Sequence, residues 1–513
     1  MNGDRKLVSL TGMAALLALL WLPAAATALS ASEENGRTIY FKGEDAAGKK
    51  ITALFGKDLV EMNGGTARCS GCHGSDGLGR PESGVVPLNI RWKNLVKTYG
   101  HLHPDESGHG QFTEHSLKSY LRDGIYPGGL RGDSSMPVYD IDDAALDDLL
   151  AYMRLIGTAA DPGVDDTAIR IGLVAAKGEE SAVAAEETIR AYFGEINEQG
   201  GIYRRRLLIE VLGSGPGDNQ SKTFGTIELG SAAGLFSADA DSTAPVPMIS
   251  LFPPDLHANG TVPDHVFALL PGLREQAFSL VSFAAGKLIG EANRFAVIFP
   301  SEPEISGIAE SLFDLSRQKG MQGGLKIEYR QGSLNAAEAF AHMKQAGADR
   351  VIFLGSPRDT ALFLKSAEGE LWLQAVLLPG QRAGSAPYAA SRELQKKIYL
   401  AYPSIPGGAD SDDLAQFRQF SKRHNLSSEH LWLRTSSYAA AKVFVEGLRR
   451  SGRELSREKF TAMLNSLKDY RTGSLRPLTF AGNRRVGLSG AYLVTPAPEE
   501  LKGIRSLGWF SAQ

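Results

Sequence analysis

The only two cysteines of this 513-residue chain lie close together, and a histidine directly follows the second. The stretch reads Cys69-Ser-Gly-Cys72-His73. The C-x-x-C-H spacing is the attachment signature of c-type haem, because each thiol can bond one haem vinyl group while the adjacent imidazole reaches the iron. The pattern predicts one covalently bound haem, with Cys69 and Cys72 as thioether positions and His73 as the proximal iron ligand.

Three other roles for these residues explain less of the pattern. A zinc site would need two further thiolates or well-placed histidines nearby. A redox dithiol is expected at the helix start of a thioredoxin-like βαβ unit, which is absent here. A structural disulfide would leave His73 without a role. Haem attachment is the interpretation that uses all three side chains.

Residues 1–28 are predicted to be a cleavable export signal and not part of the fold. Arg5 and Lys6 precede an apolar run over residues 7–22, and Ala26-Thr-Ala28 supplies a small-x-small cleavage site. No cysteine at the new N-terminus could carry a lipid, and no later run is long and apolar enough to span a bilayer. We therefore expect a soluble periplasmic protein without a membrane anchor. The formal net charge of −3 gives no support for a nucleic-acid partner.

Residues 31–157 show the pattern of a small helical domain around the haem motif. A first helix is expected over residues 34–41, with Gly36 and Tyr40 where a later helix can cross closely. A last helix begins at Asp142 and ends at Gly157, and its apolar residues recur at helical spacing. This segment resembles the monohaem cytochrome c family. The resemblance implies an all-α domain, a second iron ligand on the distal side and a role in electron transfer.

The distal ligand implied by the resemblance is expected to be a methionine. Met62 precedes Cys69 too closely to reach the opposite haem face easily, and Met153 belongs to the apolar stripe of the last helix. Met136 lies in a loop and is followed by Pro137, as distal methionines of this family usually are. We expect Met136 to bind the iron, since His/Met pairs are one of the known haem ligations. The alternative is a loop residue that covers the haem edge.

Four of the ten histidines crowd the loop before Met136, which leaves a rival set of ligands. They are His101, His103, His109 and His115. A second metal or bis-histidine ligation is one interpretation of this loop. The glycines and the proline among these residues favour a solvated loop, whose histidines contact haem propionates, backbone or water. The role of the four histidines stays open at this point.

A linker is predicted over residues 158–167, and an alternation of strands and helices follows it to the C-terminus. The linker contains Pro162-Gly163 and shows no apolar period. Alternation of buried strands with helices implies doubly wound parallel sheets. The expected strands lie at 169–174, 207–212, 295–299, 351–354, 375–378 and 398–401, and the clearest helices at 189–196, 305–318, 336–345 and 436–450.

Residues 168–513 resemble the periplasmic solute-binding proteins of the branched-chain amino acid (Leu/Ile/Val-binding) type. The stretches that carry the resemblance are Ile196-Asn-Glu-Gln-Gly-Gly-Ile202, Tyr438-Ala-Ala-Ala-Lys-Val443 and Pro477-Leu-Thr-Phe480 with Gly482-Asn-Arg-Arg485. The resemblance implies a two-lobed α/β domain of type I that holds a small ligand between its lobes. Lobe I is expected at about 168–290 and 405–490, and lobe II at about 291–404 together with the C-terminal segment.

Candidate ligand contacts follow from the rule that ligands of open α/β sheets meet the loops beyond the strand C-termini. They are Ser231, Phe252, Ser301, Ser356 and Tyr402. Each of them can also be a capping or turn residue. The first loop, residues 175–179, lacks the Thr-Gly that the family usually has, and residues 213–217 are glycine-rich where the family has acidic residues. These departures argue against an amino acid as the ligand.

Together these features predict an exported c-type cytochrome for electron transfer, fused to a small-ligand-binding or docking domain. Its redox partner would be a periplasmic dehydrogenase or oxidase of a respiratory chain. The alternative is the substrate-binding component of an ABC-type uptake or sensing system, with a permease as partner and a haem that regulates it. No catalytic constellation appears, so a non-enzyme is expected. A haem peroxidase would need an open sixth position on the iron.

Overall fold

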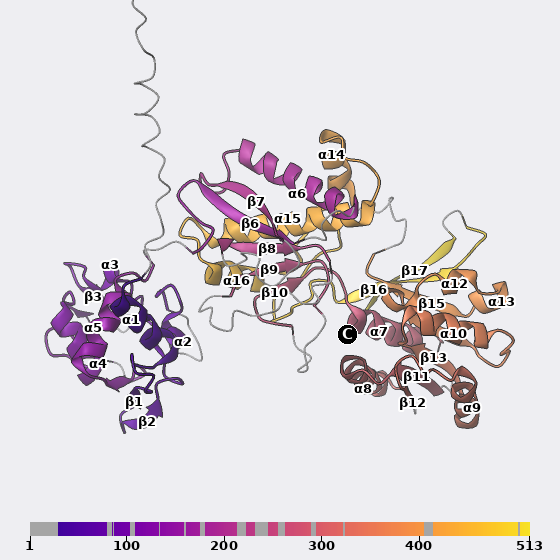
Figure 1. The fold of residues 1–513 in the computed structure, drawn as a ribbon, viewed down its shortest axis with the longest axis horizontal. Helices are drawn as coiled ribbons and strands as arrows, with labels where there is room; N and C mark the ends of the chain where they lie inside the picture. Colours follow the sequence, from indigo (N-terminus) through magenta and orange to yellow (C-terminus); the bar gives the residue numbers. More distant parts are fainter. Residues whose placement is uncertain are drawn as a thin grey trace, which may run out of the picture. The chain divides into compact units, whose positions relative to one another are not determined.

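The chain forms two compact units, Met1–Ala159 and Ala160–Gln513 (Figure 1). The computed structural model describes residues 29–79, 85, 87–102, 108–132, 134–157, 161–174, 180–212, 222–230, 245–254, 262–288, 294–321, 324–404, 414–500 and 503–512. The predicted export signal and two of the named candidates, His103 and Ser231, lie outside these residues. Within the described part of the chain, no helix has the length and apolar character needed to cross a membrane.

The first unit combines helices with two small antiparallel sheets. Its helices are α1 (Ala31–Lys42), α2 (Cys69–His73), α3 (Trp92–Leu95), α4 (Glu114–Asp123) and α5 (Asp143–Met153). One sheet has the order β2-β1-β5 (Val60–Asn63, Thr52–Phe55 and Val138–Asp140), and β3 (His101–Leu102) pairs with β4 (Gly108–His109). The expectation of an all-α domain is therefore not confirmed. Strands of two to four residues are too short to show an alternating pattern in the sequence.

Helices α1 and α5 cross closely at the positions that the sequence indicates. Gly36 is buried in α1, and a Cβ there would collide with the backbone carbonyl of Asp148 in α5. Tyr40 is fully buried, and its hydroxyl donates to the carbonyl of Gly74 at 2.6 Å, just after α2. Asp142 caps α5 by accepting a hydrogen bond from the backbone N–H of Ala145. The crossing thus ties the first and last helices to the haem motif.

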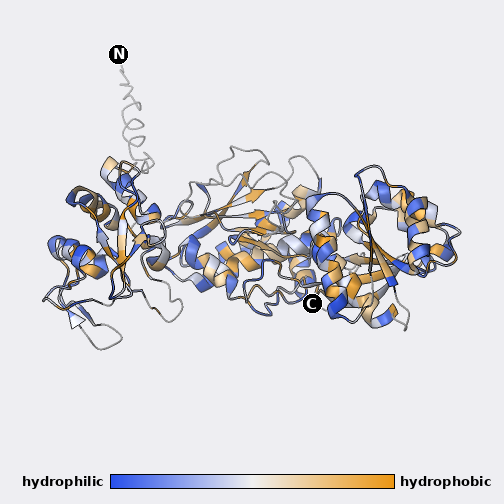
Figure 2. Cartoon of the chain, turned by 90° about the horizontal axis from the view of Figure 1, so that it is seen from below, coloured by the Kyte–Doolittle hydropathy of each residue, from blue (hydrophilic) through white to orange (hydrophobic). Residues whose placement is uncertain are grey.

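The second unit begins with a five-stranded parallel sheet in the order β10-β9-β8-β6-β7. Its strands are β6 (Ala168–Val174), β7 (Arg206–Leu212), β8 (Gly225–Glu228), β9 (Met248–Ser250) and β10 (Val266–Ala268). The three strands β8, β9 and β10 are buried at every residue, and the central strands are largely orange in Figure 2. Helices α6 (Glu180–Glu198), α14 (Ala415–Arg423), α15 (Leu431–Ser451) and α16 (Arg457–Asn465) contribute to the same core.

A second sheet of seven strands has the order β12-β11-β13-β14-β15-β16-β17. The first five run parallel: β12 (Gly324–Tyr329), β11 (Arg294–Pro300), β13 (Ala348–Phe353), β14 (Ala375–Pro379) and β15 (Ile398–Tyr402). β16 (Gly490–Pro496) and β17 (Ile504–Ser511) are antiparallel, so the sheet is mixed and not purely parallel as predicted.

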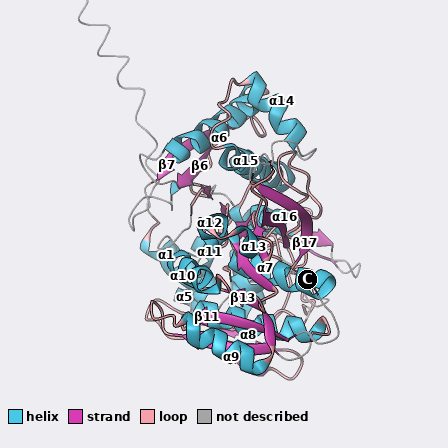
Figure 3. Cartoon of the chain, turned by 90° about the vertical axis from the view of Figure 1, so that its right-hand side faces the viewer, coloured by secondary structure: helices cyan, strands magenta, loops and turns pink. Residues whose placement is uncertain are grey.

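Helices α8 (Pro303–Gln318) and α9 (Ala336–Ala346) lie beside β11 (Figure 3). Helix α7 (Leu273–Phe283), followed by the π-helical turn Ala284–Leu288, packs on β14, β15, β16 and β17 of this second sheet. The chain therefore passes to the second sheet soon after β10, earlier than the predicted end of lobe I at about residue 290. The remaining short helices are α10 (Pro357–Ala367), α11 (Gly380–Ala383), α12 (Ala386–Ala389) and α13 (Arg392–Gln395).

The described part of the predicted linker, residues 161–167, is fastened to the second unit. The Asp161 carboxylate accepts a hydrogen bond from the backbone N–H of Arg457 at 2.5 Å, and Gly163 accepts one from the N–H of Arg170 at 2.7 Å. Asp165 accepts bonds from the backbone N–H groups of Thr167 and Ala168, both at 2.8 Å. These residues are thus part of the second unit and not a free connection.

Candidate functional site

One helical turn presents the cysteines and the histidine of the motif. Helix α2 begins after Arg68, and Gly74 (φ 73°) ends it by donating its N–H to the carbonyl of Ser70. Cys69, Cys72 and His73 all line a cavity of about 830 Å³, and Met136 lines it as well. The volume lies within the usual range for ligand pockets. The four residues predicted for the haem site are therefore brought to one place.

The proximal candidate His73 is buried and held by a backbone acceptor. Its side chain is 6% exposed, and Nδ1 lies 2.9 Å from the carbonyl oxygen of Leu88. Burial lowers the pKa of His73, which favours the neutral ring. With Nδ1–H donating to Leu88, the free lone pair lies on Nε2, the arrangement that metal-bound histidines use.

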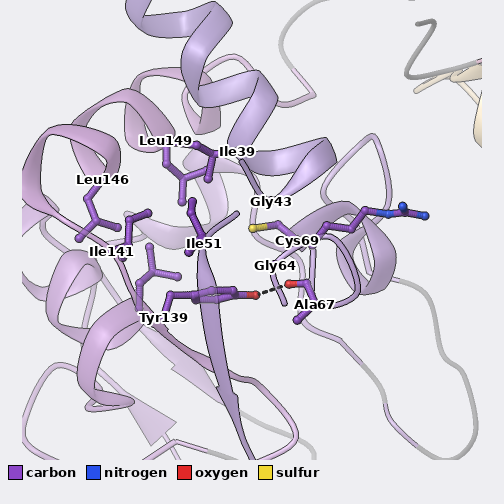
Figure 4. A pocket seen from close by; sticks show the side chains of 12 residues that line it. Ile39, Gly43, Ile51, Gly64, Ala67, Cys69, Tyr139, Ile141, Leu146 and Leu149 are labelled. Atoms are coloured by element: carbon purple, nitrogen blue, oxygen red, sulfur yellow. Dashed lines mark hydrogen bonds between the residues drawn. The ribbon is translucent and has the colours of Figure 1, made fainter. Parts of the chain in front are cut away.

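Apolar side chains surround Cys69. The Cys69 sulfur points towards a small pocket lined by Ile39, Ile51, Leu146 and Leu149 (Figure 4). The Tyr139 hydroxyl donates to the carbonyl of Ala67 at 2.8 Å beside this sulfur. Burial raises the pKa of the Cys69 thiol to about 11, so the thiol is protonated at neutral pH. Cys72, in contrast, is exposed.

The cavity does not distinguish among the three methionines of residues 31–157. Met62, Met136 and Met153 all line it. Met153 is 4% exposed and belongs to the buried stripe of α5, as the sequence indicates. Met136 is half-buried beside the buried Pro137. The choice of Met136 as the distal ligand therefore stays a prediction.

Two of the four loop histidines line the same cavity, and one of them stacks on a tyrosine. The ring of His109 stacks on Tyr126 with centroids 4.3 Å apart, and Tyr126 stacks on Tyr120 at 4.6 Å. His101 stacks on the other side of His109 at 5.0 Å. His115 is not among the residues that line this cavity. The described residues contain no group of three or more His, Cys, Asp or Glu side chains that could hold a metal ion.

The residues around the cavity fit a haem. Most of the lining side chains are apolar or aromatic, which suits the macrocycle. Thiols, an imidazole and thioethers are all groups that ligate or attach haem. Arg68 and Arg131 also line the cavity and could face propionates. The aromatic lining residues Tyr120 and Tyr126 carry no sequence signature and were not predicted.

Three candidate contacts of the second unit lie at strand ends, and the side chains of two of them bond to neighbours there. Ser301 follows β11, Ser356 follows β13 and Tyr402 ends β15, all at the carboxyl ends of the second sheet. The Ser356 hydroxyl caps α10, because Oγ accepts from the N–H of Asp359 at 3.2 Å and donates to Oδ2 at 2.9 Å. The Tyr402 hydroxyl lies 3.0 Å from the hydroxyl of Tyr388.

Phe252 lies at the first sheet, two residues after the end of β9. Its ring is 6.4 Å from that of Trp432 at the start of α15, and its side chain packs against the core of the first sheet. Phe252 is therefore not at the same sheet edge as Ser301, Ser356 and Tyr402. Ser231 lies outside the described residues.

Charged residues that were not predicted stand beside Ser356. The Arg382 Nε donates to the carbonyl of Gly355 at 3.2 Å, and its guanidinium lies 3.7 Å from Glu302 Oε1. Glu302 follows β11 and Arg382 follows β14 within α11, so both stand at carboxyl ends of strands. The signal that could have found Arg382 is its position just after the glycine that follows β14.

Comparison with known families divides the chain in the same way. Residues 219–497, more than half of the chain, match the family model described as periplasmic binding protein. Residues 53–156 match the cytochrome c family model. A cytochrome c domain implies a haem cofactor. None of the curated proteins compared with the chain matches it.

Solved structures share the fold of the second unit. A fatty acid ABC transporter substrate-binding protein from Thermomonospora curvata is similar with a TM-score of 0.51 at 16% identity, over 69% of this chain and 95% of that one. The closed form of a leucine-, isoleucine-, valine-, threonine- and alanine-binding protein from Brucella ovis has a TM-score of 0.52 at 11% identity, over 67% and 95% of the two chains. The chain belongs to the periplasmic binding protein family, and it carries a cytochrome c domain in front of that fold.

Proposed function

We propose that this protein is an exported c-type cytochrome with one covalent haem, which transfers electrons in the periplasm and is fused to a domain that binds a small ligand or docks a partner. The observation that carries the proposal is the cavity shared by Cys69, Cys72, His73 and Met136. Residues 69–73 come from one helical turn, whereas Met136 comes from a distant loop, so the fold has brought an attachment motif and a candidate distal ligand together.

In this proposal each of the four predicted haem-site residues has a defined role. Cys69 and Cys72 would hold the haem covalently: each S–H would add across one vinyl C=C bond, with sulfur bonding one carbon and hydrogen the other, so that no atom is lost. His73 would offer Nε2 to the iron while its Nδ1–H bonds to the carbonyl of Leu88. Met136 would supply the second iron ligand, so that no position would remain for oxygen or peroxide. The haem supplies a one-electron couple between Fe(III) and Fe(II).

The fold of the second unit supports a binding role and a non-enzymatic protein. Ser301, Ser356 and Tyr402, with Glu302 and Arg382, supply polar groups at one edge of the second sheet, where ligands of α/β folds bind. Fusion keeps the haem at a high effective concentration near whatever this unit holds. The redox partner in this proposal is a periplasmic dehydrogenase or oxidase.

A second function is favoured by the family match itself. The chain would then be the substrate-binding component of an ABC-type uptake or sensing system, and the haem would regulate ligand capture. Periplasmic location is common to both proposals, and both allow a small-molecule ligand. They differ in whether the redox state or the ligand is the signal that the partner receives.

Two measurements on the full-length holoprotein test these functions. Addition of dithionite and then ferricyanide should reduce and reoxidise the haem, as seen in its absorption bands. A haem that does not cycle would contradict electron transfer. Calorimetry with amino acids, short-chain acids and alcohols, in both redox states, tests capture. Tight binding in only one redox state would support the regulatory alternative, whereas no heat with any compound would favour docking.

A further inference from the structure

The acceptor that holds His73 belongs to a short segment with little regular structure. Leu88 lies in residues 87–91, just before α3, and its carbonyl receives the Nδ1–H of His73 at 2.9 Å. The Leu88 side chain lines the cavity and is only partly buried by other residues, so it does not fix this carbonyl by itself. The position of the acceptor must therefore depend on other contacts of the segment.

Those contacts centre on Arg91. Its side chain is buried, at 6% exposure, and Nε donates to the backbone carbonyl of Asp76 at 2.7 Å. One terminal nitrogen lies 3.3 Å from Asp76 Oδ2. The neighbouring Ile90 donates its N–H to the carbonyl of Gly77 at 2.8 Å. Both contacts attach the segment to residues 76–77, which directly follow the haem motif.

The surroundings of Arg91 leave little room for movement. Gly157 has φ 71°, and a Cβ there would collide with the Arg91 side chain. A Cβ at Gly77, also at φ 71°, would lie 2.6 Å from Ile156 Cγ2 and 3.5 Å from Arg91 Cγ. Two residues after Gly77, Gly79 donates its N–H to the backbone carbonyl of His73 at 3.1 Å. The guanidinium is thus packed between the turn after α2 and the end of the last helical segment.

We infer that Arg91 is a positioning residue for the proximal histidine. Its bonds to Asp76 hold the 87–91 segment so that the Leu88 carbonyl stays on His73 Nδ1. A firm Nδ1–H···O bond gives the imidazole more basic character, which stabilises the higher charge of Fe(III) over Fe(II). Arg91 therefore lowers the reduction potential without touching the haem. This inference rests on the haem site proposed above.

The test is the reduction potential of the full-length holoprotein carrying R91K. Lysine keeps the positive charge, but its single nitrogen cannot reproduce the planar fork of arginine, which reaches both the backbone carbonyl and Oδ2 of Asp76. We expect the equilibrium between Fe(III) and Fe(II) to move about tenfold towards Fe(II), a rise of about 59 mV for a one-electron couple. D76N weakens only the longer contact, between the Arg91 terminal nitrogen and the Asp76 side chain at 3.3 Å. It should therefore raise the reduction potential by less than R91K does. The haem bands of both variants should keep the form of an intact axial pair.

Arg122 provides a matched control in the same unit. Its Nε donates to the carbonyl of Ile141 at 2.9 Å and its NH1 to Asp143 Oδ1 at 2.9 Å, a similar fork away from the 87–91 segment. R122K should leave the potential unchanged. An equal shift in R122K, or no shift in R91K and D76N, would overturn the inference. If R91K does not fold, the reduction potential of D76N tests the inference, because D76N keeps the 2.7 Å bond from Arg91 Nε to the backbone carbonyl of residue 76. Wild-type protein without covalent haem would instead contradict the proposed function.

Discussion

The haem cavity and the edge of the second sheet differ in how the predicted residues are engaged. In the cavity, Cys69, Cys72 and His73 stand on one helical turn and face a shared space. At the sheet edge, Ser356 caps a helix and Tyr402 meets Tyr388, so these side chains already serve local structure. A motif defined by covalent chemistry can be proposed from its spacing alone, whereas a ligand contact depends on which neighbours the fold supplies.

The largest effect is expected for replacement of both thiols. The variant C69S/C72S should lose covalent haem completely, because the chain has no other cysteine. Haem staining after denaturing electrophoresis measures the covalent fraction. Single replacements should retain one thioether and some stained haem. Covalent haem in the double variant would show that the first unit does not use this motif.

The second-largest effect is expected for replacement of Met136, the proposed distal ligand. M136A should abolish the methionine–iron absorption band and lower the reduction potential, because methionine ligation raises it. The change should exceed a tenfold shift of the redox equilibrium, about 59 mV. M62A is the control, since Met62 lines the same cavity. Loss of the band in M62A together with its retention in M136A would assign the distal role to Met62.

A smaller effect, on stability, is expected for the two serines at the edge of the second sheet. S356A should lower the free energy of unfolding by about 1 kcal/mol, the usual cost of a lost N-cap. S301A should change it by less than about 0.5 kcal/mol, since Ser301 is an exposed serine at a neighbouring strand end. Urea titrations of both variants give these values. Equal stability of S356A and wild type would show that Ser356 is not a structural cap and leave it available for ligand.

The smallest effect concerns residues 161–167, at the start of the second unit. Burial alone would raise the pKa of Asp165, but hydrogen bonds from Arg170, Thr167 and Ala168 hold it well below its usual range. The carboxylate is 42% exposed, so after discounting for solvent screening its stabilisation is about 0.5 kcal/mol.

Because the folded-state pKa is depressed, this stabilisation is present above about pH 4 and is lost as the pH falls through the folded value. D165N should therefore be less stable than wild type at pH 7, and the difference should shrink at lower pH. Urea titrations at pH 7 and pH 3 measure it. A difference that does not depend on pH would mean that the charge of Asp165 does not fasten this segment.

The sequence predicted those parts of the fold that have long, regular patterns. The strand over 169–174 and the helix over 305–318 match β6 and α8 closely, because a buried strand and a long amphipathic helix both leave a clear period. The sheet β2-β1-β5 was missed because its strands have at most four residues. The packing of α7 on the second sheet was missed for another reason, since periodicity shows which face of a helix is buried but not against which sheet.

For the site, the sequence could predict side chains but not the backbone groups that orient them. Cys69, Cys72 and His73 carry a recognisable spacing, whereas the acceptor for His73 is a carbonyl, which any residue could supply at position 88. The contact between Arg91 and Asp76 joins residues fifteen positions apart through an irregular loop, so no period reports it. Arg382 and Glu302 meet only after strands β11 and β14 align in one sheet.

The most direct test of the central claim is an anaerobic redox titration of the full-length holoprotein, with the haem content determined in parallel. The account predicts a reversible transition that takes up one electron per chain and bound haem, with both axial ligands retained in the two states. A chain that binds no haem, or a haem that takes up no electron reversibly, would contradict it.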